Sequence, residues 1–177
     1  MLPSDDLALD PNYPPQTFRS WKLSKDRNAV TAERGVIYVA APPGTMDEMD
    51  GWATARGVEV GCTVPSPKTA DVVSYLEAFY TGMKVELLPS DTFTFSSWDD
   101  PATMNRKPNP PSFVALCTPS TSIRIRVRPA SPTSPYAYQL NLDDLLDGAI
   151  ESLPADAYAL LLLVEHDLYE SDDDEFC

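Results

Sequence analysis

The strongest constraint on the fold is a strand–helix–strand pattern in the first half of the chain. Residues 35–41 form a short apolar run rich in β-branched side chains, and the Pro-Pro-Gly that follows indicates a turn. From about residue 67 to 81, apolar residues recur with helical spacing between a Ser-Pro start signal and Gly82. Residues 85–88 form a second apolar run. This order predicts two parallel strands joined by a right-handed helical crossover.

The second half of the chain predicts more strands and one further helix. Residues 113–117 are apolar, and residues 123–128 alternate strictly between apolar and Arg, which is typical of a strand with one wet face. A helix is predicted from about 142 to 153, with Asn141 as its N-cap. The continuous apolar run at 158–164 is typical of a strand buried on both faces in the middle of a parallel sheet. We therefore expect an α/β fold with a small, mostly parallel sheet and two main helices.

Composition divides the 177 residues into three parts. Residues 1–34 are predicted to be an irregular leader that contains several prolines, and residues 35–169 an α/β domain. A Ser-, Thr- and Pro-rich stretch at about 90–111 is predicted to be a loop insertion in that domain. Residues 170–177 are an acidic end, which we expect to be solvated.

The charge of the chain excludes several classes of partner. It has 13 Lys and Arg against 27 Asp and Glu, a net charge of −14, and residues 129–177 contain no Lys or Arg. Such a chain is a poor ligand for nucleic acids and for anionic membrane surfaces. It contains no run of 18 apolar residues that could span a bilayer and no secretory signal at its start. With only three Cys as well, we expect an intracellular protein, cytoplasmic or nuclear.

Metal chemistry is limited by the presence of a single His in the whole chain. A catalytic zinc site usually needs three protein ligands, whereas His166 has only Glu165 and Asp167 beside it. We expect His166 to be a strand-end residue hydrogen-bonded to a neighbouring carboxylate or carbonyl. The acidic run from Asp172 to Glu175 lacks the spacing of a calcium loop and is expected to be solvated.

Other candidate groups also have an ordinary structural interpretation. Arg124, Arg126 and Arg128 share one strand face and could bind an anion, but the wet side of a strand is the simpler interpretation. Neither a phosphate-binding glycine loop nor a nucleophile–base pair is present, and we expect Cys62 and Cys117 to be ordinary thiols. No residue is therefore predicted to be catalytic, to bind a cofactor or to hold a metal, and an enzyme that works without a metal is disfavoured.

The stretch from Tyr136 to Tyr169 resembles the segment of archaemetzincins that precedes their active-site helix. In that family of zinc metallopeptidases, an Arg-bearing strand leads to a Gln-Leu helix start, a Pro-x-Asp-Ala turn and a buried strand that ends in Asp-Leu-Tyr. The positions here that match are Arg128, Gln139, Pro154, Asp156, Ala157, Asp167, Leu168 and Tyr169. The helix and strands of residues 35–88 also fit the family's opening, so the resemblance implies a metzincin-like N-terminal subdomain.

The chain also departs from this family. It lacks the HExxHxxGxxH zinc motif and the Cys-rich segment that follows, so no catalytic or metal residue can be transferred. The resemblance therefore implies the N-terminal portion of an archaemetzincin-like zinc metallopeptidase, an incomplete domain without peptidase activity of its own. Zinc and a peptide or protein substrate would be expected only where the missing half is present.

An alternative function is a non-catalytic binding or regulatory protein derived from the same fold. Its acidic residues would then bind a basic protein partner. Absence of zinc and of proteolysis from this chain, with both gained on addition of the motif-bearing half, would support the peptidase hypothesis. A cooperative melt of a monodisperse 177-residue chain would support the binding hypothesis.

Overall fold

The computed structural model describes residues 17–25, 28–55, 67–98 and 111–171. The chain divides into two compact units, residues 1–31 and 32–177. The first unit contains a short helix, α2 (Phe18–Leu23), in the segment predicted to be irregular. Thr17 and Ser20 form a reciprocal capping box at its start, because each side chain accepts a hydrogen bond from the backbone N–H of the other residue. This local capping signal was missed in the sequence because the surrounding prolines suggested an irregular chain.

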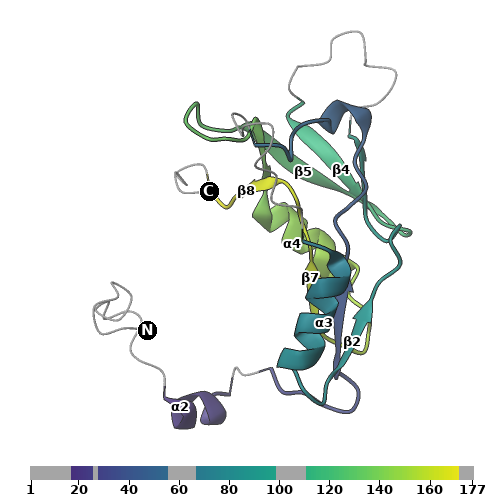
Figure 1. The fold of residues 1–177 in the computed structure, drawn as a ribbon. Coiled ribbons are helices and arrows are strands. Elements are labelled where there is room, and N and C mark those ends of the chain that lie inside the picture. Colours follow the sequence, from purple (N-terminus) through teal and green to yellow (C-terminus); the bar gives the residue numbers. More distant parts are fainter. Residues whose placement is uncertain (1–16, 26–27, 56–66, 99–110, 172–177) are drawn as a thin grey trace. The chain divides into compact units, whose positions relative to one another are not determined.

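The second unit contains the predicted strand–helix–strand pattern as part of a three-stranded parallel sheet (Figure 1). Its elements are β1 (Val36–Ala40), α3 (Thr69–Phe79), β2 (Lys84–Leu87) and β7 (Ala157–Leu162). The strand order is β2-β1-β7, and both neighbours run parallel to β1. The α/β class and the parallel crossover from β1 to β2 are thus confirmed.

The strand in the middle of this sheet is β1, and β7 lies at its edge. Residues 37–40 of β1 are buried, whereas Ala159 and Leu161 of β7 are exposed, Leu161 by 39%. The prediction that residues 158–164 form a central strand buried on both faces is therefore wrong. A continuous apolar run shows that a strand has two apolar faces, but it does not show what covers them.

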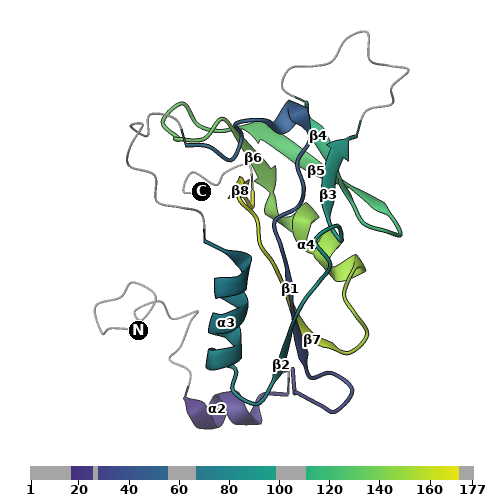
Figure 2. The ribbon, with the colours of Figure 1, turned by 45° about the vertical axis from the view of Figure 1, so that its right-hand side comes forward.

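A second sheet of five strands accompanies the parallel one (Figure 2). Its strands are β3 (Thr94–Ser97), β4 (Phe113–Cys117), β5 (Ser122–Pro129), β6 (Tyr138–Asn141) and β8 (Asp167–Tyr169), in that spatial order. Neighbours are antiparallel except β6 and β8, which are parallel. The predicted loop insertion at 90–111 thus includes strand β3, whose Phe95 is buried although its other residues are polar. Gln139 and Leu140 belong to strand β6 and precede the next helix instead of starting it.

Helix α4 (Leu142–Glu151) packs against β5 and β6. Asn141 caps it as predicted, since its side chain accepts a hydrogen bond of 3.1 Å from the backbone N–H of Asp144. Gly148 faces the sheet so closely that a Cβ atom there would lie 2.8 Å from Cδ2 of Leu116. The core around this contact also includes Trp52 from the segment after the 3-10 helix Asp47–Met49.

The apolar face of α3 is much less covered than its periodicity suggests. No residue of α3 is buried, and Tyr75 and Phe79 are 64% and 65% exposed. Gly82 has a φ of 92°, the left-handed conformation expected after a helix end. No helix in the described ranges is long and apolar enough to cross a lipid bilayer.

Candidate functional site

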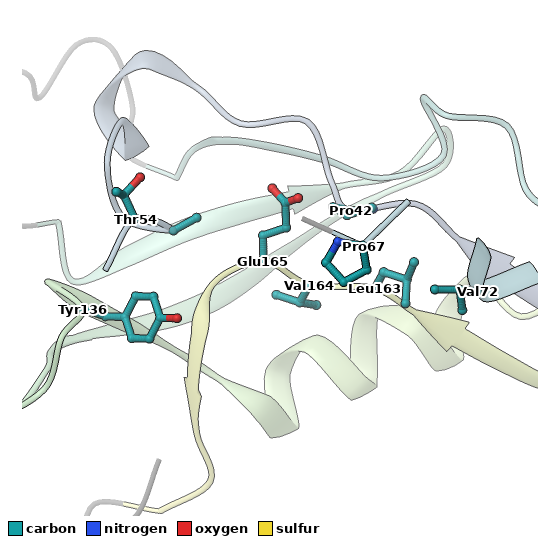
Figure 3. Close-up of a pocket in the computed structure, with 9 residues that line it drawn as sticks. Pro42, Thr54, Pro67, Val72, Tyr136, Leu163, Val164 and Glu165 are labelled. Atoms are coloured by element: carbon teal, nitrogen blue, oxygen red, sulfur yellow. The ribbon is translucent and has the colours of Figure 1, made fainter. Parts of the chain in front are cut away.

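The candidate site is a pocket of about 540 Å³ at the carboxyl ends of β1 and β7 (Figure 3). The chain leaves β1 towards β2 on one side, and β7 lies on the other side, so the sheet has a topological switch point between β1 and β7. Open parallel sheets bind ligands in the crevice outside such a point. The volume also lies within the range of roughly 300–1,000 Å³ that is usual for small-molecule sites.

Among the described residues, three groups with polar side-chain atoms line this pocket. They are the carboxylate of Glu165, which follows β7, the hydroxyl of Thr54 and the phenol of Tyr136. None of these side-chain groups forms a hydrogen bond or ion pair with another residue in the part of the chain that the structure describes. The remaining lining residues are Pro42, Ala53, Pro67, Val72, Leu163 and Val164.

His166 is buried beside this site. It is 8% exposed, and its ring packs edge-on against Phe95 with the ring centroids 5.5 Å apart. Neither ring nitrogen has a hydrogen-bond partner among the described residues, so the expected bond to a carboxylate or carbonyl is not found. Burial lowers the pKa of His166 below its ordinary value, and the nearby Glu165 opposes this only partly. The imidazole is therefore neutral at pH 7.

The two acidic neighbours of His166 have different environments. Glu165 is exposed and lines the pocket, whereas Asp167 is half-buried in β8 and accepts a hydrogen bond of 3.0 Å from Nε2 of Gln139. No group of three His, Cys, Asp or Glu residues with the arrangement of a metal site occurs in the described ranges. His166 and its two diverging carboxylate neighbours therefore do not supply the three converging ligands of a catalytic zinc ion.

Several residues that carry the archaemetzincin resemblance form one polar cluster between β5, β6 and β8. Nε of Arg128 donates a hydrogen bond of 2.8 Å to Oε1 of Gln139, and the guanidinium lies 4.1 Å from the ring centroid of Tyr169. Gln139 is 3% exposed and connects Arg128 with Asp167. These contacts give the matching residues a structural role, because they tie three strands together.

The Pro-x-Asp-Ala turn is also structural. The backbone carbonyl of Asp156 accepts hydrogen bonds from the N–H groups of Gly35 and Val36 at the start of β1. The side-chain carboxylate of Asp156 accepts a hydrogen bond of 3.0 Å from the hydroxyl of Tyr38. The turn therefore attaches the beginning of β7 to the beginning of β1.

The arginines of β5 are engaged by protein groups. Arg126 forms a bidentate interaction with Asp144, with Nε and Nη2 each 2.9 Å from a carboxylate oxygen. The guanidinium of Arg124 lies 4.6 Å from the ring centroid of Phe113. With Arg128 bound to Gln139, the three side chains do not converge on a site for an anion.

The remaining sequence candidates divide between described and undescribed residues. Cys117 is half-buried, and its sulfur lies 3.1 Å from the hydroxyl oxygen of Ser96. Cys62, Cys177 and the acidic run 172–175 lie outside the described residues.

Comparisons with known proteins add no relative. No family model, no curated protein and no solved structure matches this chain. The site is therefore interpreted from its own geometry.

The pocket was not predicted from the sequence, because its lining residues come from distant segments. Pro42 and Glu165, the first and last of them, are more than a hundred residues apart. One signal was available in the sequence. Pro42 and Glu165 each follow a predicted parallel strand, and the carboxyl ends of such strands often form a binding site.

Proposed function

We propose that this chain is the N-terminal part of an archaemetzincin-like zinc metallopeptidase and that it has no peptidase activity by itself. The observation that carries the proposal is the uncovered edge and apolar face of β7. The sequence resemblance supports the family, and the polar cluster around Gln139 shows that matching residues form a connected unit.

The edge of β7 that faces away from β1 pairs with no strand in the described ranges. Parallel sheets are normally covered on both faces, and an unpaired strand edge promotes aggregation. In the functional protein we expect a further strand to pair with this edge. We assign that strand to another part of the same domain, because only a longer protein would contain the zinc-binding motif that the resemblance implies.

An apolar groove beside β7 supports the same proposal. A cavity of about 360 Å³ lies between β7 and α4, and leucines from both elements line it, among them Leu146 and Leu161. Leu146 is 50% exposed, Leu161 39% and Ile150 67%. Full burial of one such side chain stabilises a fold by roughly 1.5–3 kcal/mol relative to exposure. A covering element would therefore gain substantial binding energy from this groove.

We propose that the catalytic zinc ligands come from that further part, since this chain lacks the HExxHxxGxxH motif and its described residues contain no group of metal ligands. Peptide or protein substrates are likewise proposed only for the longer protein. We further propose an intracellular location, cytoplasmic or nuclear, because a chain with three Cys resembles proteins of reducing compartments.

The direct test is the intact mass of the endogenous protein. It would be captured with an antibody raised against residues 139–157 and compared with the recombinant 177-residue chain of 19.5 kDa as a standard. We expect a mass well above 19.5 kDa, bound zinc, and peptidase activity that a chelator abolishes. A natural species of 19.5 kDa without zinc or activity would refute the proposal.

A second function, an acidic binding protein, is favoured by the exposed side of α4. Asp147 and Glu151 are exposed there beside Leu146 and Ile150, and the helix carries no Lys or Arg. A basic partner with an apolar face would complement this surface. In that case the 177-residue chain melts cooperatively as a monodisperse species. Replacing Asp147 and Glu151 by Lys would weaken its association with the basic partner, whereas the control Glu77→Lys on α3 would not.

A further inference from the structure

We propose that the pocket at the carboxyl ends of β1 and β7 binds an organic cation, a primary ammonium or guanidinium group carried on an apolar body. This inference does not rest on the proposed function, because it follows from the charge, volume and position of the pocket and requires neither the family resemblance nor a further strand at the edge of β7. Its basis is the combination of a cavity of ligand size, a switch-point position and a lining with one charge.

The charge of the lining selects a cation. Among the described residues that line the pocket, only Glu165 carries a formal charge, and no described cation pairs with it. The neighbouring His166 does not neutralise it, because the buried imidazole stays uncharged at pH 7. The net charge of −14 adds a long-range field that attracts cations and repels anions.

The polar groups match the hydrogen-bonding needs of an ammonium group, which has three donors and no acceptor. The carboxylate of Glu165 and the hydroxyl oxygens of Thr54 and Tyr136 are acceptors that other described residues leave unused. In Figure 3 the ring of Tyr136 lies on one side of Glu165, and Pro42 and Val72 lie on the other. A cation bound at Glu165 would thus have an aromatic ring and a hydroxyl on one side and apolar side chains on the other.

The apolar walls require a ligand with an apolar body. Pro42, Pro67, Val72, Leu163 and Val164 form the apolar part of the lining. A bare inorganic cation would leave these walls in contact with water and would find only one carboxylate, too few oxygen ligands for a divalent ion. An alkyl or aryl amine would displace water from the walls while its charged end pairs with Glu165.

The start of α3 beside Pro67 favours an anion instead. The helix dipole places roughly half a positive charge there, and Lys68, the N-cap residue, adds a full one. Asp71 in the first turn of α3 offsets the charge of Lys68. Of the described charged side chains, Glu165 lines the cavity itself, so we expect an anionic ligand to bind more weakly than a cation.

The test uses benzylamine, which is a cation at pH 7, with benzyl alcohol and phenylacetate as neutral and anionic analogues of similar size. Binding to the 177-residue chain is followed by shifts of backbone amide signals in NMR spectra. We expect saturable shifts with benzylamine at residues around Glu165, and affinities at least about tenfold weaker for the alcohol and the carboxylate.

Two matched variants test whether the carboxylate of Glu165 binds the cation. Glu165→Gln should weaken benzylamine binding at least about tenfold, because it removes the charged acceptor and keeps its shape. Glu77→Gln, an exposed position on α3 that does not line the pocket, should leave binding unchanged. Both variants should keep the circular dichroism spectrum of the parent chain. Equal binding of all three compounds, or of the parent and Glu165→Gln, would overturn the proposal.

A capped tripeptide, acetyl-Leu-Lys-Leu-amide, distinguishes the two sources of such a cation. Stronger binding of the peptide than of benzylamine, lost in Glu165→Gln, would identify a basic side chain of a protein as the occupant. Stronger binding of benzylamine would identify a free amine. The absence of amide shifts around the pocket with both probes would refute the site.

Discussion

Replacement of Asn141 by Ala should destabilise the second unit by about 2 kcal/mol, as follows from two of its contacts. Asn141 is fully buried, with an exposed fraction of 0%. Its side-chain oxygen accepts a hydrogen bond of 3.1 Å from the backbone N–H of Asp144 and one of 2.8 Å from Nη2 of Arg126. It therefore caps α4 and links that helix to β5.

The two contacts contribute unequally. Loss of a helix N-cap typically costs about 1 kcal/mol. A hydrogen bond from a charged donor is worth roughly 1.5–3 kcal/mol when shielded. The side chain of Arg126, however, is 52% exposed and keeps its ion pair with Asp144. We therefore reduce the second contribution to about 0.5–1 kcal/mol. The bond from Nδ2 of Asn141 to the carbonyl of Glu170 is long, at 3.4 Å, and adds little.

The assay is urea unfolding followed by circular dichroism and tryptophan fluorescence. With a slope of about 2 kcal/mol per molar urea, the midpoint of Asn141→Ala should fall by about 1 M. Asn141→Asp is the control, because a carboxylate keeps both acceptor contacts and favours a helix N-terminus. A midpoint change below about 0.2 M for Asn141→Ala, or equal losses in both variants, would refute this account of the cap.

Three further predictions use the same unfolding assay. Gln139→Met should lower stability by about 2 kcal/mol because it removes the hydrogen bonds of Gln139 with Arg128 and Asp167, and its loss should not add to that of Asp167→Ala. Additive losses would contradict the cluster. Because burial lowers the pKa of His166 below 6.5, the unfolded chain binds the proton more readily, so stability should fall as the pH drops from 7 to 5.5, by at most about 1.4 kcal/mol per pH unit. In the variant His166→Leu, stability should not change with pH between 7 and 5.5. If the variant kept the pH dependence of the parent chain, His166 would not be its cause. Gly148→Ala should lower stability because the new Cβ atom would lie 2.8 Å from Cδ2 of Leu116, and the loss should be smaller in a Leu116→Ala background. Equal losses in the two backgrounds would show that contact with Leu116 is not the cause.

Sequence reasoning succeeded where the determining contacts are local. The cap at Asn141, the alternation of β5 and the parallel crossover from β1 to β2 follow from neighbouring residues and from the handedness of the chain. It failed where the environment of an element depends on distant segments. The run at 158–164 was assigned to the middle of a sheet, whereas β7 lies at its edge.

The candidate site shows the same division. The sequence singled out His166 as the single His of the chain, with Glu165 and Asp167 as its neighbours, but it did not predict that Glu165 lines a pocket. The structure separates them, since Glu165 is exposed in the pocket and His166 is buried against Phe95. Tyr136 and Thr54 carried no signal of their own, because a single hydroxyl in a turn-rich segment is common.

The sequence by itself determined the α/β class, the charge of the chain and the lack of an HExxHxxGxxH motif, because these depend on periodicity, composition and the order of residues. Only the tertiary structure decided that β1 is central and β7 is at the edge, and that the ends of these strands form a pocket around Glu165. The physical reason is that hydrogen-bond capping and amphipathic spacing act within a few residues. Strand order and side-chain contacts between distant segments depend on which apolar surfaces pack together and are removed from water.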